Sequence, residues 1–225
     1  MHNIVKICSV FLMTACISSC KSGIDINTID KSYKTDSITV TAPIPQLSGL
    51  SGKDLQEAVN SEYLSISNEL LNKFNSSAKQ TGAKSFFEMQ TTPYYNNHNL
   101  LSIVTQIDSE IAKNNKNSLR ITKNIDTKAC VELTLGDLFS DDRYIDMINS
   151  RIEYEITENP DKYRDLWEKP KLSHNQRFYI DGSNIVLFYP PYELSYYERG
   201  FVEIPISLKD MSGYLKSDYA YLSGT

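Results

Sequence analysis

The first twenty residues constrain this chain most, because they decide which cysteines remain to hold a fold together. Lys6 is followed by a mainly apolar run over residues 7–17 and then by Ser18, Ser19 and Cys20. One positive charge, about ten apolar residues and a few small residues form the layout of a secretory signal peptide. The run is shorter than the roughly 20 residues that span a bilayer. The pattern therefore predicts export of the residues that follow.

The end of this segment resembles a bacterial lipobox, in which an aliphatic residue and two small residues precede a cysteine that receives a diacylglyceryl group. The motif reads ISSC at residues 17–20 and predicts a lipoprotein signal peptide over residues 1–19, with Cys20 lipidated. A second match, MTAC at residues 13–16, makes Cys16 the alternative. The polar residues after Cys20 favour Cys20. A plain signal peptide or a short membrane anchor is the other interpretation.

Export reduces the number of cysteines that are available for disulfides. Of the four cysteines, Cys8 and Cys16 leave with the signal peptide and Cys20 carries the lipid. Cys130 alone remains in the folded body, so no intramolecular disulfide is expected. Cys130 lies in an apolar, strand-like stretch, which is typical of a buried and unreactive thiol. The fold must then depend on its hydrophobic core.

The organisation of the exported chain predicts an α+β fold of antiparallel β-sheets packed with a few amphipathic helices. Residues 20–36 are polar and predict a flexible tether. Ser51 is expected to cap a helix whose apolar positions recur every three or four residues: Leu55, Val59, Tyr63, Ile66, Leu70 and Phe74. Several β-prone runs follow, with a hairpin turn at residues 113–117.

The second half repeats this order. A helical turn is expected at residues 134–139, and Ser140 could cap a longer helix with apolar residues four apart: Tyr144, Ile148, Ile152 and Ile156. Asp181-Gly182 between two β-prone runs predicts a hairpin, and residues 207–211 a last short helix. Helices grouped with hairpins indicate two small sub-domains, over residues 37–128 and 129–217, followed by a tail at 218–225.

The second sub-domain resembles the C-terminal domain of the RsiV-type extracellular proteins from Leu133 to about Leu215. The matching segments occur in the family's order: LTLGDLF at 133–139, FYIDG at 178–182, LFY at 187–189, PYEL at 191–194, and Ile204-Pro205. Residues 44–126 are similar to the domain that precedes it, which also occurs in the peptidoglycan deacetylase PdaC. The resemblance therefore identifies a PdaC/RsiV-like domain followed by an RsiV-like domain.

The best understood relative is a membrane-spanning anti-sigma factor whose outer part binds lysozyme. The resemblance thus implies an extracytoplasmic binding or sensing role in the cell envelope. We find neither a sigma-binding segment nor a spanning helix beyond the signal peptide, so signalling is expected to need a partner.

The sequence argues against catalysis. His98 and His174 do not occur in the paired spacing of a zinc site, and neither a nucleophile elbow nor a phosphate-binding glycine loop is present. We expect both histidines to lie in exposed loops. The prediction is a protein that is not an enzyme, with no catalytic residues, no metal and no cofactor.

The tyrosines provide the candidate site. Eleven of the 15 follow residue 140, and four of these lie between residues 189 and 197. Tyrosine combines a large contact area with few rotatable bonds and a polar tip, which suits recognition of proteins or sugars. The candidate ligand-binding residues are Tyr192, Glu193, Tyr196, Tyr197 and Arg199. A buried Tyr–Glu pair that fixes a turn is the alternative for Tyr192 and Glu193, whereas Tyr196 and Arg199 are expected to be exposed.

The net charge of −5 excludes an electrostatic nucleic-acid binder. It suits a basic protein partner, because opposite charge speeds association. The leading hypothesis is therefore a lipoprotein, anchored in a bacterial membrane, that binds a lysozyme-like protein outside the cytoplasm. The alternative is a non-catalytic module that binds peptidoglycan or another glycan. An envelope hydrolase is a third hypothesis, opposed by the missing motifs.

Lipidation can be tested directly. We expect Cys20→Ala to abolish incorporation of radiolabelled palmitate, because the thioether forms on that sulfur. If Cys16 is used instead, Cys16→Ala should abolish it. Labelling that survives the double substitution would contradict the lipoprotein hypothesis.

Overall fold

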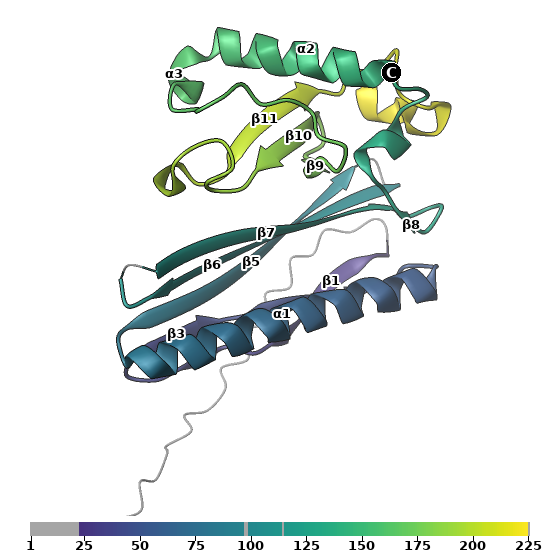
Figure 1. Cartoon of the computed structure of the whole chain (residues 1–225). Coiled ribbons are helices and arrows are strands. Elements are labelled where there is room, and N and C mark those ends of the chain that lie inside the picture. The colour runs from purple at the N-terminus through teal and green to yellow at the C-terminus, as the bar shows by residue number, and fades with distance from the viewer. Residues whose placement is uncertain (1–22, 97–98, 114, 225) are drawn as a thin grey trace, which may run out of the picture.

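The computed structural model describes residues 23–96, 99–113 and 115–224, which form two α+β units stacked one above the other (Figure 1). The predicted α+β class with mainly antiparallel sheets is confirmed. Both cysteines of the lipobox motifs lie outside the described residues.

The first unit is a six-stranded sheet in the order β2-β3-β5-β6-β7-β8. Its strands are β2 (Tyr33–Lys34), β3 (Ile38–Thr41), β5 (Ser85–Asn96), β6 (Leu100–Ile111), β7 (Asn115–Asp126) and β8 (Val131–Glu132). All pairs are antiparallel except β3 with β5. That pair is parallel because a helix runs between its strands, as a crossover requires. The predicted hairpin is confirmed and joins β6 to β7, but its turn is shorter than residues 113–117, because residues 115–117 pair with β6.

One long helix, α1 (Lys53–Thr81), covers one face of this sheet (Figure 1). Val59, Tyr63 and Phe74 are buried as the periodicity predicts. In the middle of α1 the buried face is formed by Ser67 and Leu71. Ile66 and Leu70 lie beside this face and are half-buried. Ser51 does not cap the helix; Gly52 is the N-cap residue. No helix in the described part of the chain is long and apolar enough to cross a membrane.

The predicted flexible tether over residues 20–36 is wrong for the residues that the structure describes. Strand β1 (Asp25–Asp30) pairs along its whole length with β4 (Pro43–Ser48). Ile24 is buried and Ile26 packs against the core of the first unit. The other side chains of β1 are exposed, and all of them except Ile29 are polar. The polar composition suggested a tether, but pairing of the backbone with β4 makes residues 25–30 a strand.

The second unit is a three-stranded antiparallel sheet in the order β11-β10-β9. Its strands are β9 (Phe178–Ile180), β10 (Asn184–Tyr189) and β11 (Val202–Ser207). The hairpin predicted around Asp181-Gly182 joins β9 to β10 and is confirmed. Helices α2 (Arg143–Glu158) and α3 (Pro160–Tyr163) lie above the sheet (Figure 1). Ile148 and Ile152 of α2 are buried in this core, as their spacing predicts.

Several boundaries in the second half differ from the predictions. Helix α2 begins after Asp142 rather than after Ser140. Ser207 ends β11, and residues 208–211 form turns rather than the predicted helix. The predicted tail is wrong, because 3-10 helix η3 (Ser217–Ser223) buries Tyr219 and Leu222 in the second core. The turn at 134–139 is confirmed as η1 (Leu135–Leu138), whose capping box links Thr134 and Asp137.

Cys130 lies in a tight turn before β8, not in a strand. Its φ angle is +54° and its thiol is half-buried. The backbone N–H of Gly52 donates a hydrogen bond to its sulfur, with 3.2 Å between the atoms. The thiol therefore packs at the start of α1 rather than deep in the core. Because β8 extends the first sheet, the chain leaves the first unit after Glu132 rather than at residue 128.

The two units meet at the outer edge of β9. The Ser102 hydroxyl accepts a hydrogen bond from the Ile180 N–H at 3.0 Å and donates to Asn124 Oδ1 at 2.6 Å. The Asn124 and Asn96 side-chain amides donate to the carbonyls of Phe178 and Ile180 at 3.0 and 3.1 Å. Asn96, Ser102 and Asn124 are all buried. We call these three side chains the polar seam. They supply partners that a neighbouring strand would otherwise give to the edge of β9.

The polar seam makes a stability prediction. Asn124→Ala should lower the free energy of unfolding by about 2 to 3 kcal/mol, because the buried Phe178 carbonyl loses its donor and the Ser102 hydroxyl loses its acceptor. Urea unfolding followed by circular dichroism measures the change. Asn117→Ala, at an exposed position of the same strand, is the control and should change it by less than about 0.5 kcal/mol. Equal effects of the two substitutions would contradict a structural role for the seam.

Candidate functional site

Exposed aromatic side chains gather on two loops of the second unit. Tyr192, Tyr196 and Tyr197 lie between β10 and β11, and Trp167 lies after α3. Tyr192 is 66%, Tyr196 63% and Trp167 53% exposed, whereas Tyr197 is half-buried. We call these four residues the aromatic surface. Large exposed aromatic groups in one place mark an interaction site more often than isolated ones do.

The rings of the aromatic surface contact one another in two pairs. Trp167 and Tyr196 meet edge to face with 5.3 Å between ring centroids. Tyr192 and Tyr197 lie 5.5 Å apart with their planes tilted by 41°. Because Tyr196 and Tyr197 are consecutive residues, the pairs occupy adjoining parts of the loop.

Backbone contacts fasten the two loops together. The Trp167 N–H donates to the Leu194 carbonyl at 3.0 Å. The Ser195 hydroxyl donates to the Asp165 carbonyl at 2.9 Å. Leu194 and Ser195 are buried. The aromatic rings therefore stand on a loop whose base is fixed, which lowers the entropy lost on binding.

The two charged candidates are engaged within the protein. Glu193 forms an ion pair with Arg177 at 2.9 Å. The Arg199 guanidinium donates to the Lys162 carbonyl and lies 3.7 Å from the Asp165 carboxylate. The Arg199 side chain is only 20% exposed, so the expectation that it points freely into solvent is wrong. Arg199 therefore helps to hold the loop, whereas Glu193 and its partner Arg177 are exposed at the surface.

Tyr192 adopts a backbone conformation that a bulky residue rarely takes. Its φ angle is +68°, in the left-handed region that costs a residue other than glycine about 1 to 2 kcal/mol. It sits in the turn in which the Glu193 N–H donates to the Pro190 carbonyl at 3.1 Å. The alternative of a buried Tyr–Glu pair is wrong, because Tyr192 is exposed. Strain that no burial offsets is typical of functional positions.

Negative charge lies beside the aromatic surface. Burial and then the Asp108 carboxylate raise the pKa of the Tyr197 hydroxyl, with a smaller contribution from Glu110. Both acids belong to the far end of β6. The long β6–β7 hairpin therefore approaches the loop that carries Tyr197.

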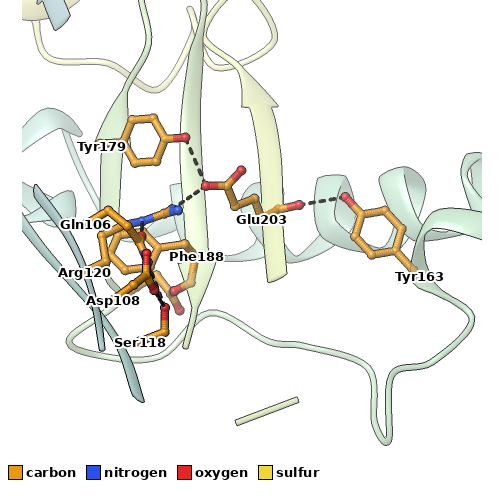
Figure 2. Close-up of polar contacts among 9 residues, drawn as sticks. Gln106, Asp108, Ser118, Arg120, Tyr163, Tyr179, Phe188 and Glu203 are labelled. Carbon is orange, nitrogen blue, oxygen red and sulfur yellow. Dashed lines mark hydrogen bonds and ion pairs between the residues drawn. The ribbon is translucent and has the colours of Figure 1, made fainter. Parts of the chain in front are cut away.

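A second polar cluster, in addition to the polar seam, joins the two units further along β6 and β7. Arg120 of β7 pairs with Glu203 of β11 across the gap between the sheets, as Figure 2 shows. Arg120 Nε also donates to Gln106 Oε1 at 3.1 Å, and the Tyr179 hydroxyl donates to Glu203 Oε1 at 3.2 Å. The guanidinium carbon lies 4.3 Å from the centre of the Phe201 ring. Cation–π contact and ion pairing together hold this arginine in place.

Sequence reasoning identified the tyrosines but missed their partners. Trp167 is the only tryptophan of the chain, which was an available signal. Arg120 and Glu203 are 83 residues apart, and no local pattern links them. His174 is exposed as predicted, and His98 lies outside the described residues. Within the described ranges, no group of three or more His, Cys, Asp or Glu residues could hold a metal ion.

Comparison with known proteins first shows which domain family and which fold the chain resembles. Residues 136–209 match the family model described as a protein of unknown function, DUF3298. A DUF3298 protein from Bacteroides fragilis superimposes with a TM-score of 0.65 at 14% identity, covering 90% of this chain and 97% of the other. A second, from Pseudomonas aeruginosa, gives 0.64 at 13% identity, covering 89% and 97%. These structures share the fold of both units.

A curated relative then gives the family. Over 193 residues the chain is 30% identical to the anti-sigma-V factor RsiV of Bacillus subtilis, covering 80% of this chain and 67% of RsiV. The chain belongs to the RsiV-like family of DUF3298 proteins.

The strain at Tyr192 can be measured. Tyr192→Gly should be more stable than Tyr192→Ala by about 1 kcal/mol, because glycine takes a positive φ without a steric penalty. At Tyr196, where φ is −61°, the order should reverse by about 0.5 to 1 kcal/mol, because glycine only adds chain entropy. Thermal unfolding of the four variants gives both differences. The same order at both positions would exclude strain at Tyr192.

Proposed function

We propose that this chain is a lipid-anchored binding module of the bacterial cell envelope that captures a lysozyme-like protein through the aromatic surface. Homology to an anti-sigma factor supports a membrane-associated envelope protein that works by binding. Lipidation at Cys20, or at Cys16, would anchor the module outside the cytoplasm.

The observation that carries the proposal is the combination of exposure and strain at Tyr192. The side chain is 66% exposed and its backbone φ angle is +68°. The fold gains little from burying this ring, yet it holds the ring in a costly conformation. Exposed tyrosine and tryptophan are the residues that most often dominate binding energy at protein interfaces. A ligand that covers Tyr192, Tyr196 and Trp167 would recover that cost.

Charge supports a basic ligand. The chain has a net charge of −5, and Asp108 and Glu110 place carboxylates near Tyr197. A negative field next to an aromatic contact surface accelerates encounter with a cationic protein, while the aromatic contacts set the lifetime of the complex. Many lysozymes are basic proteins, which fits this division of roles.

A binding experiment tests the proposal. The full-length chain in detergent, immobilised on a sensor, should bind a chicken-type lysozyme. Tyr192→Ala and Tyr196→Ala should each weaken binding at least tenfold, a loss of about 1.4 kcal/mol per factor of ten. The matched control is Tyr154→Ala, because Tyr154 on α2 is also exposed, at 57%, but lies outside the aromatic surface.

Cytochrome c provides the control for charge, because it is a basic protein of similar size without muramidase activity. It should bind weakly and lose that binding in high salt. Equal binding of cytochrome c and lysozyme would reduce the interaction to electrostatics. No binding of lysozyme, or equal effects at Tyr154 and Tyr192, would contradict the proposal.

A further inference from the structure

Two adjoining hollows lie along the second sheet, and the larger of them lies between this sheet and the first unit. The larger, of about 480 Å³, is lined by β5, β6 and β7 on one side and by Tyr179, Phe201 and Glu203 on the other. The smaller, of about 390 Å³, shares those last three residues and continues toward Lys162 and Arg199. Both volumes fall in the range of small-molecule sites. None of the four residues of the aromatic surface lines either hollow.

This cleft exists because the second unit covers only part of the first sheet. Strands β5, β6 and β7 are twelve residues long. The polar seam lies near one end of them, at Asn96, Ser102 and Asn124. Further along the same face lie Thr92, Gln90 and Gln106, which line the larger hollow. The region between the seam and the free end of the hairpin therefore stays accessible.

The walls of the cleft combine aromatic rings with planar polar groups. Tyr94 stacks on Tyr179 with centroids 5.3 Å apart, and Phe201 lies 5.9 Å from Phe188. Gln106 is fixed between its neighbours, donating to Ser118 Oγ at 2.9 Å and accepting from Arg120 Nε. The polar groups are thus positioned before any ligand arrives, as Figure 2 shows for Gln106, Arg120 and Glu203.

Two polar atoms in this network have unused capacity. Arg120 uses Nε and Nη1 for Gln106 and Glu203. Glu203 uses Oε1 for both Arg120 and Tyr179. Within the described part of the chain, Arg120 Nη2 and Glu203 Oε2 have no hydrogen-bond partner. The Glu203 side chain is 39% exposed. A donor and an acceptor therefore stand close together at the wall of the cleft.

Charge balance limits the ligand class. In the larger hollow, Arg120 and Glu203 neutralise each other. In the smaller one, Lys162 pairs with Glu155 and Arg199 with Asp165, while the Asp181 carboxylate accepts from the backbone N–H groups of its own turn. An anion would meet the Glu203 carboxylate and a cation would meet the guanidinium, so neither is favoured. A neutral ligand with many hydroxyls fits, because each hydroxyl both donates and accepts.

We propose that this cleft binds a short neutral oligosaccharide, with hydroxyls paired to Arg120 and Glu203 and C–H faces packed against Tyr94 and Phe201. Two hollows that share a wall accommodate more than one sugar ring. The site adjoins the aromatic surface, because Tyr197 interacts with Ser118 at the wall of the larger hollow, but Tyr192 and Tyr196 do not line it. The module would then recognise a glycan and a protein at separate places.

Calorimetry tests the proposal with the full-length chain in a zwitterionic detergent that contains no sugar. The probes are tri-N-acetylchitotriose, maltotriose and, as an anion, inorganic phosphate. At least one sugar should give saturable heat, and phosphate should give none. Thr92→Arg should lower sugar affinity at least tenfold by filling the larger hollow from an exposed position. Thr39→Arg, an exposed position on neighbouring strand β3 outside the cleft, should bind as the unchanged chain does.

Each outcome decides the question. No heat with either sugar, heat with phosphate alone, or equal binding by the Thr92→Arg and unchanged chains would overturn the proposal. Circular dichroism confirms that the variants are folded. Thr92→Arg should keep its lysozyme binding and Tyr192→Ala its sugar binding. Failure of one site is therefore distinguishable from failure of the other.

Discussion

The arrangement of the molecule depends on how the edge of β9 is satisfied. A three-stranded sheet presents two edges, and an exposed edge invites pairing with other chains. Here the polar seam supplies side-chain partners to the backbone of Phe178 and Ile180. Buried polar groups add little net stability, but they allow few alternative arrangements, because any shift would leave them unpaired. The seam therefore fixes where the second unit sits on the first.

This placement creates both candidate sites. Because the seam lies near one end of long strands, the remainder of β5, β6 and β7 lies opposite Phe201 and Glu203 and forms one wall of the cleft. The same extension brings Asp108 toward Tyr197, as its effect on the tyrosine pKa indicates. The ion pair between Arg120 and Glu203 forms a second connection in the middle of the gap. Two fixed contacts define the relative orientation of the units better than one could.

The sequence predicts the local elements well and their assembly poorly. Alternation and turn residues identified the β6–β7 and β9–β10 hairpins, although the first turn is shorter than predicted, and spacing identified α1. Strand β1 was missed because most of its side chains are polar and exposed, while the backbone of β4 holds it. Arg199 was expected in solvent because local sequence gives no sign of the Lys162 carbonyl that it meets 37 residues away. Five candidate residues were named, yet Trp167 and Arg177, which complete their surroundings, come from other loops. Contacts between distant segments are set by packing, which no short pattern encodes.

The structural relatives indicate where specificity resides. A fold shared at 13 to 14% identity over about 90% of the chain shows that very different side chains can build these two units. Function in such a fold is carried by particular sites rather than by the architecture. The aromatic surface stands on loops, which can change without disturbing a core. The cleft instead lies between sheets, where a change at Arg120 or Glu203 also affects the contact between the units. Ligand choice at the loops can therefore vary more freely than ligand choice in the cleft.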